Sequence, residues 1–410
     1  MTRLDGRTAL VGVTGGIACY KSCEIVRLLV GAGAQVRVVM TAAAREFVTP
    51  LTLQTLSGHP VATDTFDLTQ ESEIGHIALA DGADVVLVAP ATANVLAKAA
   101  RGIADDLLTT ILLATRAPLV LAPAMNVHMW EHPAVQENLA TLVARGARVV
   151  GPASGSLACG YEGTGRLADP ADVVDEVLHA LAPQDLAGEH VLVAAGPTQE
   201  PIDPVRYLSN RSSGKMGYAI ARVARRRGAE VTLVTGPTAL PPPPGVRIVA
   251  VTTAVEMARA VEAAFGAASV VVMTAAVADY RPRRPRSRKM KKGPATITLE
   301  LERNPDILAG LGRRKGSRIV VGFAAETHDL LAEGRRKLAA KRCDLIVANE
   351  VSAPGLGFGA DQSAVHLLDR DGRHEPLPAM PKEEVAARIL DWVASRRARS
   401  TARHVLKRVR

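Results

Sequence analysis

Short runs of consecutive apolar residues alternate with amphipathic stretches along most of the chain. The first apolar run, at 8–13, is followed by a Thr-Gly-Gly turn, a helical pattern at 17–29 and a second apolar run at 36–40. Uninterrupted apolar runs of this length are typical of parallel strands that are buried on both faces. The opening of the chain therefore predicts a right-handed β-α-β unit.

The same alternation continues to the end of the first half and then starts again. In the first half we expect strands at 84–89, 118–122 and 148–151, with helical stretches at 92–100 and 104–115. In the second half we expect strands at 190–195, 247–251, 269–273, 319–323 and 344–347, with a helical pattern at 218–227. Regular β/α alternation is typical of α/β proteins.

The repeat of the opening pattern predicts two domains of one design. We predict two Rossmann-like, doubly wound parallel-sheet domains, at residues 1–182 and 190–395, joined by a linker at 183–189. Aromatic residues make up only 3% of the chain, so the two cores must be aliphatic.

The net charge of +9 is concentrated in two segments. Residues 281–292 hold eight Lys or Arg and residues 396–410 hold seven, with no acidic residue in either segment, so the rest of the chain is net negative. We expect 396–410 to be a solvated, disordered end, and a nucleic-acid-binding segment is the alternative. The four cysteines show no metal-ligand spacing, which favours a reduced cytoplasm, and no run of about 20 apolar residues predicts a membrane span.

The stretch DPVRYLSNRSSGKMG at 203–217 combines cationic, amide and hydroxyl donors. It follows a predicted strand and leads into a predicted helix, whose N-terminus adds a positive partial charge. This position favours an anion site for a phosphate or carboxylate group. The alternative is an ordinary polar loop that caps a helix.

The turn at Thr14, Gly15 and Gly16 stands where a β-α-β unit binds phosphate. It lacks the G-x-G-x-x-G spacing of a dinucleotide site, so a mononucleotide held by this turn and by the hydroxyl of Thr41 fits better than NAD. His76, the segment 89–94, the segment 123–126 and Cys159 fall at the same predicted edge of the sheet. Each of them alone is weak evidence for a functional site, because a lone His often caps a helix and a lone Cys is often an inert apolar residue.

In the second half, Asp279 follows the strand that ends at Met273, and the basic segment with Lys289 comes next. Clustered cations near an aspartate at a strand end are what a metal-bound nucleoside triphosphate requires. A solvated basic loop is the alternative.

Several motifs in a fixed order carry a resemblance to a known family. The first half contains VTGGIACYK, GHIAL, APATAN, GIADDLLTT, APAMN and LACG, and the second half contains SNRSSGKMG, AAVADY, KMKK and NPDIL. To about residue 395 the chain resembles the bacterial bifunctional phosphopantothenoylcysteine decarboxylase and phosphopantothenate–cysteine ligase of coenzyme A biosynthesis. The resemblance implies a flavodoxin-like, flavin-dependent cysteine decarboxylase domain followed by a ligase domain.

For the first domain, the resemblance implies FMN as cofactor and assigns two sets of residues. The catalytic residues would be His76, Asn126, which grips the substrate carboxylate, and Cys159, which acts as a proton donor. The FMN-binding residues would be Thr14, Gly15, Gly16, Thr41, Thr92, Asn94 and Met125.

For the second domain, the resemblance implies CTP with Mg²⁺, and 4′-phosphopantothenate and cysteine as substrates. Asn210 would act in catalysis, together with Arg206 and Ala276 on the acyl-nucleotide intermediate, and Asp279 would bind the metal. The CTP-binding positions would be Asp279, Lys289, Pro305, Asp306, Ile307, Leu308, Phe323, Lys337 and Lys341.

The resemblance also implies a homo-oligomer, with a dodecamer as the expected form. Two other functions stay open at this point. One is a flavoprotein decarboxylase for a different cysteine-containing substrate with a degenerate second domain, and the other is a nucleic-acid-binding module that uses the two basic segments.

Overall fold

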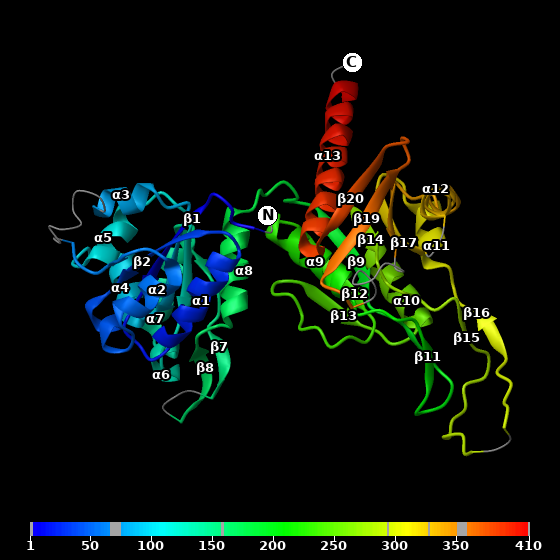
Figure 1. The fold of residues 1–410 in the computed structure, drawn as a ribbon, viewed down its shortest axis with the longest axis horizontal. Coiled ribbons are helices and arrows are strands. Elements are labelled where there is room, and N and C mark those ends of the chain that lie inside the picture. Colours follow the sequence, from blue (N-terminus) through cyan, green and yellow to red (C-terminus); the bar gives the residue numbers. More distant parts are fainter. Residues whose placement is uncertain are drawn as a thin grey trace. The chain divides into compact units, whose positions relative to one another are not determined.

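A computed structural model describes residues 3–65, 75–156, 160–292, 295–326, 329–350 and 359–408 of the chain. The chain divides into two compact units, Met1–Ala182 and Pro183–Arg410, each with its own hydrophobic cores (Figure 1). None of the helices that lie in the described ranges is both long and apolar enough to cross a membrane.

The first unit is built on a six-stranded parallel sheet in the order β3-β2-β1-β4-β5-β6. The strands are β1 (Thr8–Val13), β2 (Gln35–Met40), β3 (Val61–Ala62), β4 (Val85–Ala91), β5 (Leu119–Pro123) and β6 (Arg148–Val149). A separate antiparallel pair is formed by β7 (Ala153–Ser156) and β8 (Glu162–Arg166). This sheet order is that of a Rossmann-type doubly wound fold, in which the chain changes direction across the sheet between β1 and β4.

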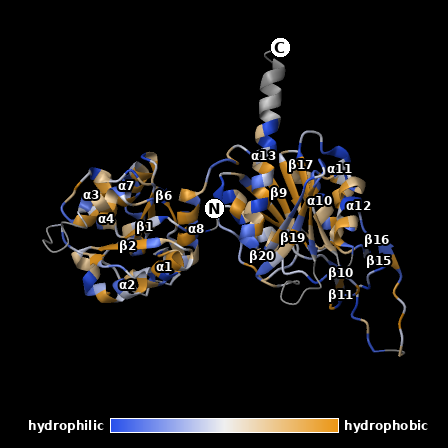
Figure 2. Ribbon diagram, turned by 45° about the horizontal axis from the view of Figure 1, so that its top comes forward, coloured by the Kyte–Doolittle hydropathy of each residue, from blue (hydrophilic) through white to orange (hydrophobic). Residues whose placement is uncertain are grey.

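Helices cover both faces of this sheet. The helices are α1 (Cys19–Gly31), η1 (Ala42–Glu46), α2 (Pro50–Ser57), α3 (His76–Asp81), α4 (Ala93–Arg101), α5 (Leu107–Ala114), α6 (Val127–Glu131), α7 (Pro133–Ala144) and α8 (Pro170–Leu181). Side chains of α1, α2 and α8 pack on one face, and those of α3, α4, α5 and α7 pack on the other. Successive residues of β1 and β4 therefore point into different cores, which explains their uninterrupted apolar sequences. Figure 2 shows hydrophobic residues along the strands at the centre of each unit.

The second unit contains an eight-stranded sheet in the order β13-β12-β9-β14-β17-β18-β19-β20. Its strands are β9 (His190–Ala195), β12 (Glu230–Thr235), β13 (Arg247–Ala250), β14 (Val270–Met273), β17 (Ile319–Glu326), β18 (Leu345–Glu350), β19 (Gln362–Asp369) and β20 (His374–Pro381). The six strands from β13 to β18 are parallel and repeat the order of the first unit. The predicted doubly wound parallel sheet is confirmed, and the antiparallel strands β19 and β20, which the sequence did not predict, extend it at this edge.

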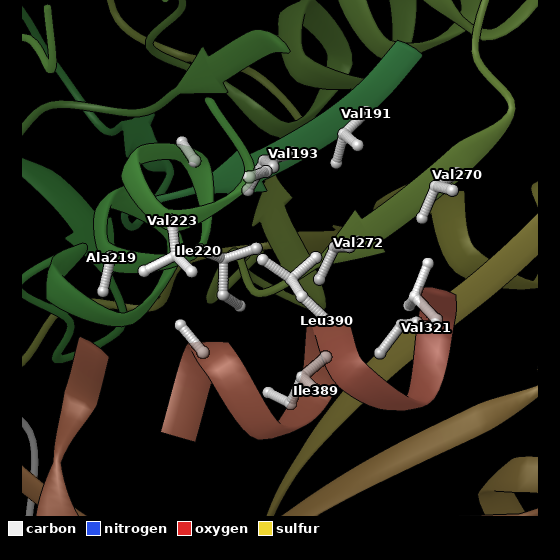
Figure 3. Close-up of a cluster of buried hydrophobic side chains, with 14 of the residues drawn as sticks. Val191, Val193, Ala219, Ile220, Val223, Val270, Val272, Val321, Ile389 and Leu390 are labelled. Atoms are coloured by element: carbon white, nitrogen blue, oxygen red, sulfur yellow. The ribbon is translucent and has the colours of Figure 1, made fainter. Parts of the chain in front are cut away.

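The helices of the second unit also form two layers. They are α9 (Lys215–Arg226), α10 (Ala254–Phe265), α11 (Ile307–Arg314), α12 (Leu330–Ala340) and α13 (Lys382–Arg408). Helices α9 and α13 cover one face, while α10, α11 and α12 cover the other. Figure 3 shows Ile389 and Leu390 of α13 beside Ile220 and Val223 of α9, over the side chains of the strands.

Two short antiparallel pairs extend from the second unit. The first joins β10 (Gln199–Pro201) to β11 (Tyr207–Ser209), and the second joins β15 (Tyr280–Pro282) to β16 (Leu301–Arg303). Strands β10 and β15 lie in contact with each other. The basic segment 281–292 begins in β15, and two of its arginines pair with Glu302 and Glu300 of the neighbouring strand segment.

The expected linker belongs to the second unit. Leu186 is fully buried there, and the Arg227 guanidinium binds the Asp185 carboxylate at 2.8 Å and 2.5 Å. The backbone N–H of Leu186 also donates to the carbonyl of Arg227. The anchoring contacts of the second unit therefore begin before β9.

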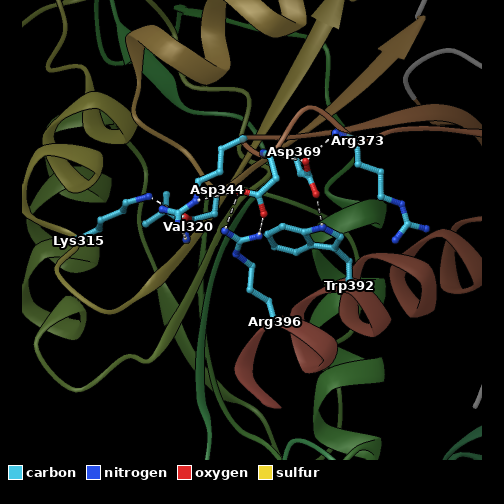
Figure 4. A network of polar contacts seen from close by, with 9 residues as sticks. Lys315, Val320, Asp344, Asp369, Arg373, Trp392 and Arg396 are labelled. Atoms are coloured by element: carbon cyan, nitrogen blue, oxygen red, sulfur yellow. Dashed lines mark hydrogen bonds and ion pairs between the residues drawn. The ribbon is translucent and has the colours of Figure 1, made fainter. Parts of the chain in front are cut away.

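The C-terminal segment differs from the disordered end that we expected. Helix α13 continues to Arg408, because no Gly or Pro interrupts the sequence from Lys382 onward. Arg396 binds Asp371 at 2.5 Å and lies over the ring of Trp392, whose indole N–H donates to Asp369. Figure 4 shows this network continuing to Asp344.

Asp344 is the buried centre of that network. Its carboxylate accepts hydrogen bonds from Lys315 at 2.8 Å and from the backbone N–H of Val320 at 3.0 Å, and it pairs with Arg370 at 2.9 Å. A buried carboxylate requires such partners. The network joins the start of β18, the turn between β19 and β20, and helix α13.

We expect Leu390→Ala to lower the free energy of unfolding of the second unit by about 2–5 kcal/mol, because Leu390 is fully buried between α13 and the sheet. Urea unfolding monitored separately for the two units would show this as an earlier transition of one unit. Leu113→Ala is the matched control, since that side chain is 65% exposed. An unchanged transition would mean that α13 is not packed as described.

Candidate functional sites

The first unit has a cavity of about 1020 Å³ at the carboxyl ends of its strands. It lies at the switch point between β1 and β4, where doubly wound sheets bind ligands. Eight residues predicted from the sequence line it together: Thr14, Gly15, Gly16, Thr41, Thr92, Asn94, Met125 and Asn126. The segments that supply them lie far apart in the chain, so the fold brings the predicted residues to one place.

Threonine hydroxyls hold the segments around this cavity. The Thr14 hydroxyl is buried, donates to the carbonyl of Pro90 at 2.6 Å and lies 3.3 Å from the hydroxyl of Thr92. Thr92 caps α4 by accepting from the N–H of Val95, and Thr41 caps η1 by accepting from the N–H of Ala44. The first turn and the loop after β4 are therefore held together, and η1 and α4 begin beside them, an arrangement suited to an anion.

Gly15 is required by the close approach of two loops. A Cβ atom at Gly15 would lie 2.4 Å from the Cβ of Ala43, which no real side chain tolerates. At Gly16 the nearest atom to such a Cβ would be Thr92 Cγ2, at 3.8 Å, an ordinary contact. Gly15 therefore fixes the spacing between the first turn and η1, whereas Gly16 leaves its backbone open toward the cavity.

Charged residues that the sequence analysis did not select also line this cavity. They are Lys21, Lys98, Arg166 and Asp106. Lys98 binds Asp105 at 2.7 Å, and Asp106 caps α5 by accepting from the N–H of Thr109 at 2.8 Å. The i+5 spacing of Lys21 from Gly16 was the available signal, because it places a cation in the first turn of the helix that follows the glycine turn.

The predicted catalytic residue His76 is not among the described residues that line this cavity. His76 begins α3, which packs against α5. Cys159 lies outside the described residues. Next to that gap, Tyr161 meets the ring of His128 edge to face at 5.3 Å, which connects the β7–β8 pair with α6.

The second unit has a cavity of about 1120 Å³, also at the carboxyl ends of parallel strands. The predicted residues that line it are Asn210, Ala276, Asp279, Pro305, Asp306, Ile307, Leu308, Phe323, Lys337 and Lys341. The loop 210–217 forms one wall, so the segment predicted to bind an anion does face the cavity.

Hydrogen bonds fix the loop that carries Ala276 and Asp279. The Asn210 amide donates to the carbonyls of Ala276 at 3.4 Å and Val277 at 3.0 Å. The fully buried Thr198 accepts from the N–H of Ala278 at 3.0 Å. Asn210 therefore positions the backbone beside the cavity and also forms part of its lining.

Asp306 and Lys341 form an ion pair at the cavity. Burial opposes ionisation of Asp306, but the Lys341 ammonium and the N–H of Ala309 outweigh it and hold the pKa of this carboxyl below its ordinary value. The pair also joins the start of α11 to the end of α12.

Arg206 and Lys289 are not among the residues that line this cavity. The Arg206 guanidinium pairs with Asp203 at 3.3 Å and donates to the carbonyl of Met290. Asp203 in turn accepts from the N–H of Met290 at 3.1 Å, so these contacts tie the β10–β11 loop to the basic segment. Lys289 is exposed on that segment.

Polar residues from other segments also line the second cavity. They are Arg336, Asn349, Ser363 and Lys382. The sequence analysis missed Ser363 and Lys382 because it did not predict the antiparallel strands β19 and β20, which carry the chain back to this edge. A polar residue in an apolar run, such as Asn349 after the strand predicted at 344–347, was the available signal.

Both halves of the chain match known protein families. Residues 1–182 match the family described as Flavoprotein, and residues 186–396 match the family described as DNA/pantothenate metabolism flavoprotein C-terminal domain. Over 396 residues the chain is 50% identical to the coenzyme A biosynthesis bifunctional protein CoaBC of Bacillus subtilis, covering 96% of this chain and 98% of the relative. The chain belongs to the CoaBC family.

The CoaBC protein of Escherichia coli K12 is 48% identical over 398 residues, again covering 96% of this chain and 98% of the relative. The family assignment made from the motifs is thereby confirmed, and this chain is a bifunctional enzyme of coenzyme A biosynthesis.

Solved structures resemble each half separately. The C-terminal domain of a CoaBC protein is 43% identical and covers 52% of this chain and 97% of its own, with a TM-score of 0.45. The FMN-dependent cysteine decarboxylase SpaF is 36% identical and covers 42% of this chain and 99% of its own, with a TM-score of 0.37.

We expect Gly15→Ala to lower the flavin content of the purified protein at least about tenfold, because the new Cβ forces the first turn and η1 apart. Absorbance near the flavin band, relative to protein concentration, measures this. Gly16→Ala is the matched control and should retain most of the flavin, since its Cβ has room. Equal flavin content in both variants would contradict this account of the turn.

Proposed function

We propose that residues 1–182 bind FMN and decarboxylate 4′-phosphopantothenoylcysteine to 4′-phosphopantetheine. The supporting observation is the cavity at the β1/β4 switch point, which gathers the turn at Thr14, Gly15 and Gly16, Thr41 and Thr92. Open backbone at Gly16 and helix starts at η1 and α4 suit the phosphate of a mononucleotide. Asn94 and Met125 would contact the ribityl chain and the ring.

A flavin, when bound, supplies a reversible two-electron oxidation of the cysteinyl thiol to a C=S group. This group accepts the electron pair that the departing CO₂ leaves on the neighbouring carbon. The chain's own residues orient the substrate and move protons. Asn126 would hold the substrate carboxylate from its position at the start of α6. His76 would serve proton transfer or orientation of the thiol, and Cys159 would protonate the carbon when the enethiol is reduced.

For the second unit we propose the CTP-dependent ligation of 4′-phosphopantothenate to cysteine. The substrate carboxylate attacks the α-phosphorus of CTP, and the bond to pyrophosphate breaks. The cysteine amine then attacks the acyl carbon, loses a proton and displaces CMP. The cavity residues Lys337 and Lys341 supply positive charge for the nucleotide, Pro305–Leu308 and Phe323 would contact it, and Lys289 would add charge from the basic segment.

Asn210, Ala276 and Arg206 would serve the acyl-nucleotide intermediate. The contacts of Asn210 with the carbonyls of Ala276 and Val277 support a role in fixing the loop against which the intermediate lies.

Mg²⁺ would bind at Asp279 together with the triphosphate oxygens. Among the residues that the structure describes, no group of three or more His, Cys, Asp or Glu could hold a metal on its own. A site with the single carboxylate of Asp279 suits Mg²⁺, which commonly uses one or two carboxylates with substrate phosphates and water.

We propose a homo-oligomer, with a dodecamer as the expected form. The position of His76 away from the cavity lining and the exposed apolar side chains of Ile17 and Tyr20 beside that cavity support assembly of the first unit. Mass photometry at micromolar concentration is expected to give a mass well above the 43.1 kDa of one chain. A single peak at the monomer mass would refute the proposal.

The function is tested by mass spectrometry of products after mixing the protein with 4′-phosphopantothenate, cysteine, Mg²⁺ and CTP, with ATP in a parallel sample. We expect 4′-phosphopantetheine and CMP, with CTP strongly preferred. Accumulation of phosphopantothenoylcysteine alone would contradict the decarboxylase assignment, and absence of both adducts would contradict the ligase assignment.

The variant Asn210→Asp tests the second step of ligation in the same assay. Its added negative charge opposes the anionic intermediate, so pyrophosphate release should continue while the cysteine adduct falls at least about tenfold. Decarboxylation of supplied phosphopantothenoylcysteine by the same variant is the internal control and should be unchanged.

A further inference from the structure

Ser363, the second residue of β19, lines the cavity of the second unit with an unsatisfied hydroxyl. The residue is 1% exposed, and its Oγ atom has no hydrogen-bond partner within the described part of the chain. A buried hydroxyl without a partner costs free energy and is rare in folded proteins. Because this hydroxyl lies at a cavity wall, a bound ligand can supply the missing partner.

Two lysines lie at the same end of the cavity. Lys215 binds Asp361 at 2.6 Å and the carbonyl of Gly359 at 2.8 Å, while Lys382 donates to the carbonyls of Ala360 and Gln362. Both ammonium groups therefore gather on the short segment 359–362, directly before Ser363.

The two ammonium groups are only partly neutralised. Burial lowers the pKa of Lys382, and repulsion from Lys215 lowers it further, against the attraction of Asp361. The Asp361 side chain is 88% exposed, so solvent screens much of its attraction. A second anion at this end of the cavity would relieve the repulsion between the lysines.

The N-terminus of α9 adds a third positive element. This helix has twelve residues, begins at Lys215, and has no side-chain cap at Gly214. Its first residues, Lys215, Met216 and Gly217, line the cavity. The first N–H groups of such a helix favour an anion.

We propose that Ser363 and Lys382 extend the anion site predicted at 203–217, which supplies Lys215 and the N-terminus of α9, into one subsite that binds a phosphate group of a substrate of the ligase reaction. The assignment rests on the proposed ligase function and adds Ser363 and Lys382, which lie outside every quoted motif. The subsite is built on the sheet face covered by α9 and α13, whereas Lys337 lies in α12, on the opposite face, and Lys341 directly follows that helix. A substrate that lies across the strand ends can reach both clusters.

Two sources can supply the phosphate group. One is the triphosphate of the nucleotide, whose outer phosphates leave as pyrophosphate, and the other is the 4′-phosphate of phosphopantothenate. Both present negatively charged oxygens that accept from a hydroxyl and from ammonium groups, so the geometry of the subsite serves either one.

Ser363→Ala is the decisive variant, because it removes only a hydroxyl that has no described partner. Its Tm should equal or exceed that of the unaltered protein, whereas the KM for one phosphorylated substrate should rise by about tenfold, as expected for a lost hydrogen bond to a charged group. Ser395→Ala is the matched control, because its hydroxyl is exposed on α13 and donates to the carbonyl of Trp392. The control should leave both KM values unchanged.

Separate titrations identify the source of the phosphate. If the subsite holds the nucleotide, Ser363→Ala and Lys382→Met raise the KM for CTP and weaken binding of pyrophosphate, measured by calorimetry. If it holds the 4′-phosphate, the KM for 4′-phosphopantothenate rises instead, and the preference for this substrate over unphosphorylated pantothenate falls.

Unchanged KM values and unchanged pyrophosphate affinity in Ser363→Ala, with ligation at the normal rate, would overturn the subsite alone. Failure of the unaltered protein to form any adduct would instead overturn the ligase function. The two failures are therefore distinguishable.

Discussion

Both cavities depend on the reversal of strand order at the centre of each sheet. In the first unit the chain runs outward from β1 to β2 and β3 and then crosses to β4; in the second it runs from β9 to β12 and β13 and then crosses to β14. Loops leave the two sides of each switch point in opposite directions, which opens a space at the strand ends. The backbone there must also approach closely, as Gly15 approaches Ala43 and Gly217 approaches Ala195 with a hypothetical Cβ distance of 2.4 Å in each case.

One design therefore serves two different chemistries through the side chains placed around the same opening. The first cavity is held by threonine hydroxyls and by helix N-termini, which suit one phosphate group and an uncharged ring system. The second carries several lysines and arginines, including Lys337, Lys341 and Lys382, which suits substrates with several phosphate groups. The surrounding elements differ more than the sheets do, because the chemistry is set by loops and helix starts.

The sequence predicted the parallel sheets well because their strands are apolar on both faces and leave a clear signal. It also predicted much of the lining of both cavities, since residues at the carboxyl ends of parallel strands must share one edge. The sequence did not predict strands β19 and β20. Segments such as HEPLPAMP contain proline and alternate irregularly between apolar and polar residues, so neither the period of a strand nor that of a helix dominates. Ser363 and Lys382 were missed for that reason. The helix at the C-terminus was also missed, because its arginines were interpreted as a solvated charged segment. In the structure, Arg396 and Arg397 have carboxylate partners in the folded unit.

The missed elements hold one side of the ligase cavity in place. Helix α13 begins with Lys382 at the cavity and packs Ile389, Leu390 and Val393 into the core. Farther along the helix, Arg396 and Arg397 form ion pairs with the rest of the unit. The network around Asp344 fixes the turn between β19 and β20 at the amino end of β18, so the antiparallel pair is anchored at the end opposite the cavity. A lysine at the first residue of a helix fixed in this way has little freedom to withdraw from its partners. The position of positive charge beside Ser363 therefore follows from packing and ion pairs on the far side of the sheet, which is why a local motif could not reveal it.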